Sequence, residues 1–169
     1  NFRLINILKI ISLMVLISVI KSQECPPSEQ IPIDPIQNSW NIPTQNNWHG
    51  LEVMTWNVKT FPISANTIDY VNEIITDILP DVIAFQEINN INSFNELENS
   101  IPAYDFIVTS GGLGLAVRMD ILQIDSFTTL FTSDGWEFAW RYPLKANLSW
   151  QCGSAVLNFQ IINVHLKAG

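Results

Sequence analysis

Three residues of this sequence carry side chains suited to metal or phosphate chemistry, and each ends an apolar run typical of a strand. They are Asn57 at the end of 51–57, Glu87 at the end of 81–87, and His165 at the end of 159–165. A carboxylate is a natural ligand for Mg²⁺, which prefers oxygen and uses few protein carboxylates. A carboxamide offers one acceptor and two donors, so it can touch both a cation and a phosphate oxygen. A histidine can hydrogen-bond a phosphate oxygen or move a proton near neutral pH.

Each of these residues also has an explanation that needs no chemistry. Asn57 would be a turn residue after a strand, Glu87 a solvated carboxylate, and His165 a histidine satisfied within the core. The chemical interpretation therefore depends on whether the fold brings all three side chains to one place.

The residues around Asn57 and Glu87 predict a strand–helix–strand unit. Apolar and polar side chains alternate over 51–57, and residues 68–78 carry apolar side chains at helical spacing. The run 81–87 is almost continuously apolar, as in a strand that is covered on both faces. Strands joined through a helix pair in parallel, so Asn57 and Glu87 should lie at the same edge of a sheet.

The second half of the chain predicts strands joined by tight turns, after a short helix or turn over 91–99. Strands are expected at 104–109, 113–118, 121–131, 137–140, 142–150 and 155–165. The dipeptides at 111–112 and 134–135 are turn signals of the kind found in hairpins. The near-continuous apolar runs predict a two-sheet α/β sandwich with three central, mutually close strands, 51–57, 81–86 and 155–164.

The ordered set of motifs from residue 51 onward resembles the endonuclease/exonuclease/phosphatase superfamily, with its deoxyribonuclease I-like fold. The matching segments are Met54-Thr-Trp-Asn57, Asp81-Val-Ile-Ala-Phe-Gln-Glu87, Gly114-Leu-Ala-Val, Arg141-Tyr-Pro-Leu and Asn163-Val-His-Leu. The resemblance implies that Glu87 binds a divalent cation, Mg²⁺ or another such as Mn²⁺ or Ca²⁺, and that Asn57 lies beside that cation and the phosphate. It also implies that His165 contacts the scissile phosphate or acts as a general acid, and that Arg141 contacts phosphate; a structural arginine at a strand start is the alternative for Arg141.

The chain also departs from this family's pattern. The later Asp-x-Asn and Asp-His motifs are absent and would lie beyond Gly169, so we expect a domain truncated at the C-terminus and an inactive fragment. The deoxyribonucleases proper carry a Glu that pairs with the histidine, whereas Gly111-Gly112-Leu-Gly occupies about that region here. This departure weakens the assignment to deoxyribonuclease itself and leaves the superfamily intact.

The N-terminal residues predict secretion. Residues 1–22 resemble a signal peptide, because basic side chains precede or interrupt an apolar run that is too short for a comfortable membrane span. An uncleaved membrane anchor or a buried first helix are the alternatives. Residues 23–50 are rich in Pro, Asn and Gln and predict an extended leader, so the domain occupies 51–169. Cys25 and Cys152 could pair with each other in an oxidising compartment, each could pair with a cysteine beyond Gly169, or both could be unpaired thiols.

Charge separates the candidate functions only weakly. The chain has 8 basic and 16 acidic residues, a net charge of −8, which argues against strong non-specific binding to a polyanion. A nuclease that relies on a bound cation for its local positive charge is still compatible with this balance. Three functions follow: a secreted nuclease, a sphingomyelinase-like or inositol-phosphate hydrolase of the same fold, and a secreted binding domain without catalysis. No stable membrane span is expected after signal cleavage.

Overall fold

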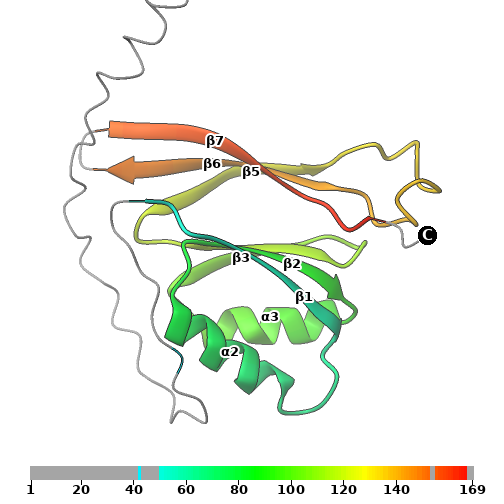
Figure 1. Cartoon of the computed structure of the whole chain (residues 1–169), viewed down its shortest axis with the longest axis horizontal. Helices are drawn as coiled ribbons and strands as arrows, with labels where there is room; N and C mark the ends of the chain where they lie inside the picture. Colours follow the sequence, from blue (N-terminus) through cyan, green and yellow to red (C-terminus); the bar gives the residue numbers. More distant parts are fainter. Residues whose placement is uncertain (1–41, 43–49, 153–154, 167–169) are drawn as a thin grey trace, which may run out of the picture.

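The computed structural model describes residues 42, 50–152 and 155–166, which form three layers (Figure 1). The strands of the four-stranded sheet are β1 Val53–Phe61, β2 Val82–Ile88, β3 Tyr104–Val108 and β4 Leu113–Arg118. The helices α2 Thr67–Ile78 and α3 Ile91–Ser100 cover one face of that sheet. The three-stranded sheet covers the other face and contains β5 Leu122–Thr129, β6 Leu144–Cys152 and β7 Ala155–Asn163. The expected two-sheet α/β sandwich is therefore confirmed.

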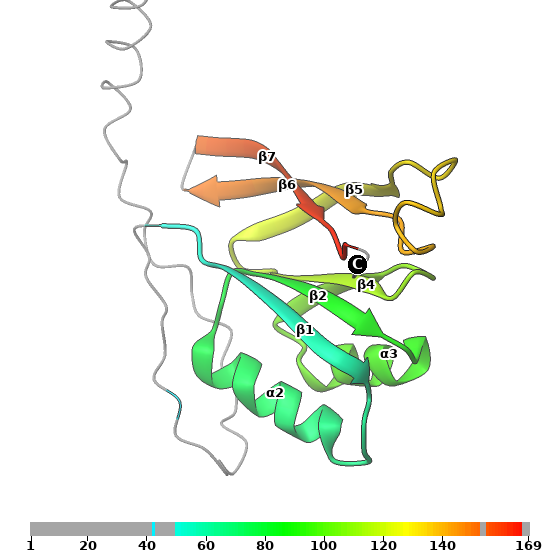
Figure 2. The same ribbon diagram turned by 45° about the vertical axis from the view of Figure 1, so that its right-hand side comes forward.

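The first sheet contains the strand–helix–strand unit that the sequence predicts. Its order is β1-β2-β4-β3, and β1 and β2 pair in parallel from Val53 opposite Val82 to Asn57 opposite Gln86. Helix α2 makes the connection and ends at Leu79, whose φ of 56° lies in the left-handed region. The parallel pairing places the ends of β1 and β2 at the same edge of the sheet (Figure 2).

Two expectations about the strands are wrong. β1 continues past Asn57 to Phe61 after a break in its pairing register, and β1 and β7 are edge strands of the described sheets, so only β2 is central. Val53 is 56% exposed, so one face of β1 is not covered. A strand in which polar and apolar side chains alternate needs cover on only one face, so it need not be central.

Residues 130–143 form a long loop between β5 and β6, and the strand expected at 137–140 does not exist. Residues 135–140 are turns, and Ala139 and Trp140 have φ values of 50° and 63°. These left-handed conformations are incompatible with an extended strand. The apolar and aromatic composition of this stretch resembled a strand, but its side chains lie in a loop.

β2 is buried on both faces, as its continuous apolar run predicts. Phe85 packs on the helix side, where its ring lies 5.3 Å from that of Phe94 and 6.4 Å from that of Phe106. Val82 and Ala84 point to the other side, into a second core between the two sheets. Full burial of an aromatic or aliphatic side chain typically stabilises a fold by about 1.5–3 kcal/mol, so β2 anchors both cores.

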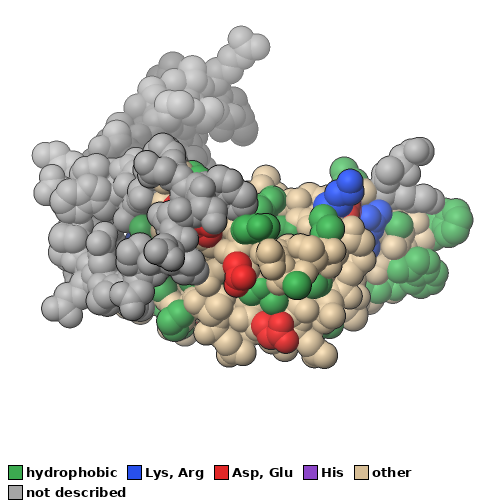
Figure 3. Space-filling model, turned by 90° about the horizontal axis from the view of Figure 1, so that it is seen from below, with side chains coloured by type: hydrophobic (Ala, Val, Ile, Leu, Met, Phe, Trp, Pro, Cys, Tyr) green, Lys and Arg blue, Asp and Glu red, His purple; other side chains and the backbone are tan. Residues whose placement is uncertain are grey.

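The helices leave a mainly polar outer surface. Figure 3 shows this face, with scattered Asp and Glu side chains and few Lys or Arg side chains. Asn90 caps α3, where its side chain accepts a hydrogen bond from Ser93 N–H at 3.2 Å. Asn66 stands at the N-cap of α2 but makes no capping hydrogen bond with its side chain. Within the described ranges, no helix is long and apolar enough to cross a membrane.

The N-terminal predictions mostly concern residues outside the described part of the chain. The signal peptide and Cys25 lie there, and so does most of the leader. The leader residue Ile42 is described, and its backbone N–H donates to Asp77 of α2 at 3.2 Å. The alternatives for the pairing of Cys25 and Cys152 stay open, since Cys25 lies outside the described residues.

Asn163, the last residue of β7, joins the two sheets. Its side-chain nitrogen donates to the carbonyl oxygens of Phe85 at 2.7 Å and Gly114 at 2.9 Å, and its oxygen accepts from Gln86 Nε2 at 2.8 Å. Asn163 is 3% exposed, so all three hydrogen bonds form away from water. A carboxamide suits this position because it provides two donors and an acceptor in one rigid group.

We predict that Asn163→Ala lowers the free energy of unfolding by about 2–4 kcal/mol, because it leaves buried carbonyls and an amide without partners. Urea denaturation of the two proteins measures this difference. Gln160→Ala on the same strand is the control: Gln160 is exposed and bonds to Asn147, so its loss should cost less than about 1 kcal/mol. Equal losses for the two variants would contradict the cross-sheet role of Asn163.

Candidate active site

The structure brings the four candidate site residues together at one end of the sandwich. Asn57 Nδ2 donates to Glu87 Oε1 at 2.9 Å, and His165 Nε2 lies 3.6 Å from the same oxygen. Arg141 Nη1 lies 3.0 Å from His165 Nδ1 and 3.2 Å from Nε2. Glu87 and Asn57 come from the first sheet, His165 follows the last strand of the second, and Arg141 lies in the 130–143 loop. Residues from both sheets thus form one continuous chain of polar contacts.

The backbone at Glu87 is held in an unusual conformation. Its φ of 65° lies in the left-handed region, which is uncommon for a residue other than glycine. The next residue, Ile88, donates its N–H to the carbonyl oxygen of Gly112 at 3.0 Å. A Cβ at Gly112 would lie 2.8 Å from the Ile88 oxygen, so the turn between β3 and β4 needs glycine to approach the end of β2 this closely. This contact fixes the strand end that presents the Glu87 carboxylate.

Asn57 is fixed at both ends of its carboxamide. Its Oδ1 accepts the Lys59 N–H at 2.9 Å, while its Nδ2 donates to Glu87. Lys59 and Thr60 have φ values of 36° and 60°, and here β1 departs from regular pairing with β2. The irregular backbone turns Lys59 N–H toward Asn57, so Asn57 orients the Glu87 carboxylate and still has an acceptor lone pair on its oxygen.

The electrostatics favour an ionised Glu87 beside a neutral His165. The hydrogen bond from Asn57 is the main cause that holds the pKa of Glu87 below its usual value. Burial opposes this effect, while His165, a backbone hydrogen bond from Thr60 and Arg141 each lower the pKa by smaller amounts. Burial lowers the pKa of His165, the Arg141 charge adds to that effect, and Glu87 opposes it. At neutral pH the imidazole is therefore uncharged and can accept a hydrogen bond from Arg141.

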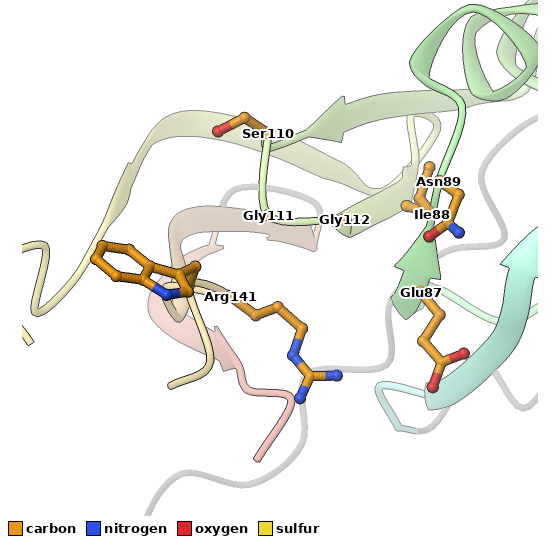
Figure 4. Close-up of a pocket in the computed structure, with 8 residues that line it drawn as sticks. Glu87, Ile88, Asn89, Ser110, Gly111, Gly112 and Arg141 are labelled. Atoms are coloured by element: carbon orange, nitrogen blue, oxygen red, sulfur yellow. The ribbon is translucent and has the colours of Figure 1, made fainter. Parts of the chain in front are cut away.

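An open groove of about 580 Å³ runs beside these residues. It is lined by Glu87, Ile88, Asn89, Ser110, Gly111, Gly112, Trp140 and Arg141. Figure 4 shows the Arg141 guanidinium extending toward the Glu87 carboxylate, with the Gly111–Gly112 turn beside them. Arg141 Nε is buried and has no hydrogen-bond partner among the described residues. An unsatisfied charged donor of this kind suits an anion such as phosphate.

The residues present fit a divalent cation of the magnesium type. The described residues contain no group of three or more His, Cys, Asp or Glu side chains that could hold a metal. Mg²⁺ does not need such a cage, since it usually keeps several waters and uses one or two carboxylates plus substrate phosphate oxygens. Glu87, ionised and half-buried, would supply the carboxylate. The carboxamide of Asn57 contacts that carboxylate through Nδ2, and its oxygen accepts from Lys59 N–H.

Several residues of the site carry no chemical role in the sequence interpretation. Gln86 and Asn163 hold the strand ends, while Asn89, Ser110 and Trp140 line the groove. Their positions in the sequence could have indicated this role, since Gln86 directly precedes Glu87 and Asn163 stands two residues before His165. No pattern in the sequence pointed to Trp140, because the segment around it resembled a strand.

Comparisons with known proteins agree with this fold. The sequence profile described as the Endonuclease/Exonuclease/phosphatase family matches residues 54–155. A crystal structure of D. rerio TDP2 humanized by 14 mutations matches with a TM-score of 0.50 and 16% identity, over 66% of this chain and 46% of that one. D. rerio TDP2 complexed with single strand DNA product matches with a TM-score of 0.53 and 16% identity, over 66% and 45%. The human Nocturnin catalytic domain with bound sulfate matches with a TM-score of 0.46 and 12% identity, over 66% and 49%.

No curated protein sequence matches the chain. The chain spans just under half the length of these solved structures. At 16% identity, the two TDP2 structures show the likeness of fold alone. The family profile covers more than half of the chain, including Asn57, Glu87 and Arg141. The chain belongs to the Endonuclease/Exonuclease/phosphatase family.

Proposed function

We propose that this chain contributes the metal and phosphate side of a phosphodiester hydrolase active site, acting on nucleic acid. The observation that carries the proposal is the contact chain from Asn57 through Glu87 and His165 to Arg141, which places an anionic and a cationic side chain beside one polar groove. An ionised carboxylate to hold a cation and an unsatisfied guanidinium to hold a phosphate are complementary parts of phosphoester hydrolysis.

Each of the four side chains has its own role in this proposal. Glu87 would hold a divalent cation, which would supply Lewis-acid polarisation of the phosphoryl group and neutralise charge on the leaving oxygen. Asn57 orients the Glu87 carboxylate, and Arg141 binds a phosphate oxygen through the donors that its contact with His165 leaves available. His165, uncharged at neutral pH, hydrogen-bonds the phosphate or takes part in proton transfer at the leaving oxygen.

Nucleic acid is the substrate class that we favour. The groove lining is mostly polar and the cation of Arg141 lies within it, as a phosphodiester backbone requires. The D. rerio TDP2 structure that shares this fold was determined with a single strand DNA product. A phospholipid phosphodiester is the second candidate, and the exposed Phe131 and Trp136 side chains favour it because aromatic groups suit lipid head-group regions.

We also propose that the protein is secreted. The support is the sequence of residues 1–22, in which basic side chains accompany a short apolar run. Fusion of these residues to a reporter enzyme, followed by assay of the culture medium, tests the proposal; retention of all reporter activity in the cells would contradict it.

We predict that Glu87→Gln in the full-length protein lowers kcat/KM by roughly 10²-fold or more and raises the Mg²⁺ concentration needed for half-maximal rate. The amide has the shape of the carboxylate but no charge for the cation. Initial rates on a fluorescent oligonucleotide over a Mg²⁺ titration measure both effects. Glu96→Gln, an exposed change on α3, is the matched control and should leave both unchanged. Equal behaviour of the two variants would remove Glu87 from the metal site.

We predict that Arg141→Gln raises the pKa of His165. The Arg141 charge disfavours the imidazolium, so its removal allows protonation at higher pH. NMR titration of the imidazole protons in metal-free protein measures the change, with His165→Gln used to assign the signal. Lys145→Gln, which removes a cation from β6, is the control and should leave the titration of His165 where it is in the unmodified chain. A pKa that falls or stays constant in Arg141→Gln would contradict the contact between Arg141 and His165.

A further inference from the structure

The 130–143 loop presents an aromatic side chain at the edge of the groove. Trp140 lines the groove and is 67% exposed, although tryptophan is usually largely buried. It directly precedes Arg141, whose guanidinium lies in the same groove. The proposed function gives a role to Arg141 and none to Trp140.

The ring of Trp140 is held in place from one side. A Cβ at Gly135 would lie 2.5 Å from Cε3 and 2.7 Å from Cζ3 of the ring, so the ring packs directly on the glycine backbone. The backbone N–H of Trp140 also donates to the Gly135 carbonyl oxygen at 2.7 Å. Gly135 is buried under these contacts, whereas most of the ring surface is open to solvent. A fixed ring with an open surface is a suitable platform for stacking.

The loop backbone adopts strained conformations to present this ring. Ala139 and Trp140 are consecutive residues with positive φ values, 50° and 63°. Non-glycine residues in the left-handed region are concentrated at ligand-binding and active sites, because strain persists only where the surrounding structure enforces it. Lys59, Thr60 and Glu87 on the first sheet have the same property, and they too belong to this site.

The charge of the chain favours an uncharged contact with nucleic acid. The net charge is −8, and Arg141 is the single Lys or Arg among the described residues that line the groove. Bulk electrostatics therefore contributes little attraction to a polyanion. Stacking of a base on an aromatic ring is independent of that attraction and of sequence, since every base has a π-face.

Two carboxylates in the same loop count against a lipid surface, which its aromatic side chains alone would suit. Asp134 and Glu137 are exposed and alternate with the exposed aromatic residues Phe131, Trp136 and Trp140. Carboxylates that enter the interface of a bilayer lose hydration, which costs free energy even where the lipids carry no net charge. The exposed polar side chains of Asn89 and Ser110 line the same groove and offer hydrogen bonds to the edge of a base.

We propose that Trp140 is a stacking platform for an unpaired nucleobase whose neighbouring phosphate is bound by Arg141. The inference rests on the proposed function and deepens it, because it selects single-stranded nucleic acid over duplex. In a duplex, neighbouring base pairs cover both faces of each base, and unstacking a base costs free energy before it can meet the ring. Gly135 is a positioning residue, since only a residue without Cβ allows the ring to pack where it does.

Binding in the absence of metal tests the proposal separately from catalysis. The probes are a fluorescein-labelled oligothymidylate and an abasic oligonucleotide of the same length, each measured by anisotropy with the full-length protein in EDTA. Trp140→Ala should weaken binding of oligothymidylate by roughly 5- to 150-fold and leave the abasic strand unaffected. Trp140→Phe should restore part of the affinity, and Gly135→Ala should reduce it in the same base-dependent way. Phe127→Ala, which removes a 51% exposed ring from β5, should change neither affinity.

The salt dependence adds a readout that a structural effect would not reproduce. Trp140 carries no charge, so Trp140→Ala should shift the affinity for oligothymidylate while leaving the slope of log affinity against log salt unchanged. Equal losses on the base-bearing and abasic strands, or no loss on either, would overturn the proposal. A loss of binding to sphingomyelin–phosphatidylcholine vesicles without a loss on oligothymidylate would overturn it in favour of lipid.

A separate experiment tests the proposed phosphodiester hydrolase function. Hydrolysis of bis(p-nitrophenyl) phosphate by the full-length protein with Mg²⁺ involves no nucleobase, so it tests phosphodiester hydrolysis independently of stacking on Trp140. Absence of this activity in the unmodified protein would count against phosphodiester hydrolysis, while the metal-free binding experiments would still decide the role of Trp140.

Discussion

The hydrogen bonds of Asn163 are the contact on which the site depends. Asn163 ends β7 in one sheet and bonds to Phe85, Gln86 and Gly114 in the other. Gln86 directly precedes Glu87, and His165 follows Asn163 by two residues. The same side chain therefore sets the spacing of the sheets and the approach of His165 to Glu87, which are 3.6 Å apart. Apolar packing between the sheets is not directional, so it could not fix this approach alone.

Local backbone strain is concentrated around the site. Five of the residues with positive φ, Lys59, Thr60, Glu87, Ala139 and Trp140, border the site, and each such conformation typically costs about 1–3 kcal/mol. The two cores that share β2 stabilise the fold enough to carry this cost. The arrangement explains why the polar residues of the site can be held in fixed positions although several of them are partly exposed.

The sequence predicted the parts of this structure that follow from periodicity. The parallel β1–α2–β2 unit and the fully buried β2 come from apolar patterns that only one arrangement satisfies. The convergence of Asn57 and Glu87 follows from that parallel pairing. The prediction of a strand at 137–140 was wrong because this apolar and aromatic loop has the composition of a strand. The left-handed backbone at Ala139 cannot be recognised from the residue types.

The cross-sheet and groove contacts could not be predicted from patterns. Asn163 and Gln86 are separated by 77 positions, and nothing in either segment shows which sheet partner the side chain meets. Trp140 is similar, because its exposure depends on its packing against Gly135 and on the path of the whole loop. Periodicity reports which face of an element is buried, whereas these contacts depend on how the two sheets are placed against each other.

The most direct test of the central claim is the position of a cation in crystals of the protein soaked with Mn²⁺. Anomalous scattering locates Mn²⁺ without any assumption about catalysis. The account predicts a peak within roughly 2.0–2.2 Å of a Glu87 carboxylate oxygen, the distance expected for a hard divalent cation. A fully occupied peak elsewhere in the groove, or no peak at Glu87 at saturating Mn²⁺, would contradict the assignment of Glu87 as the metal ligand.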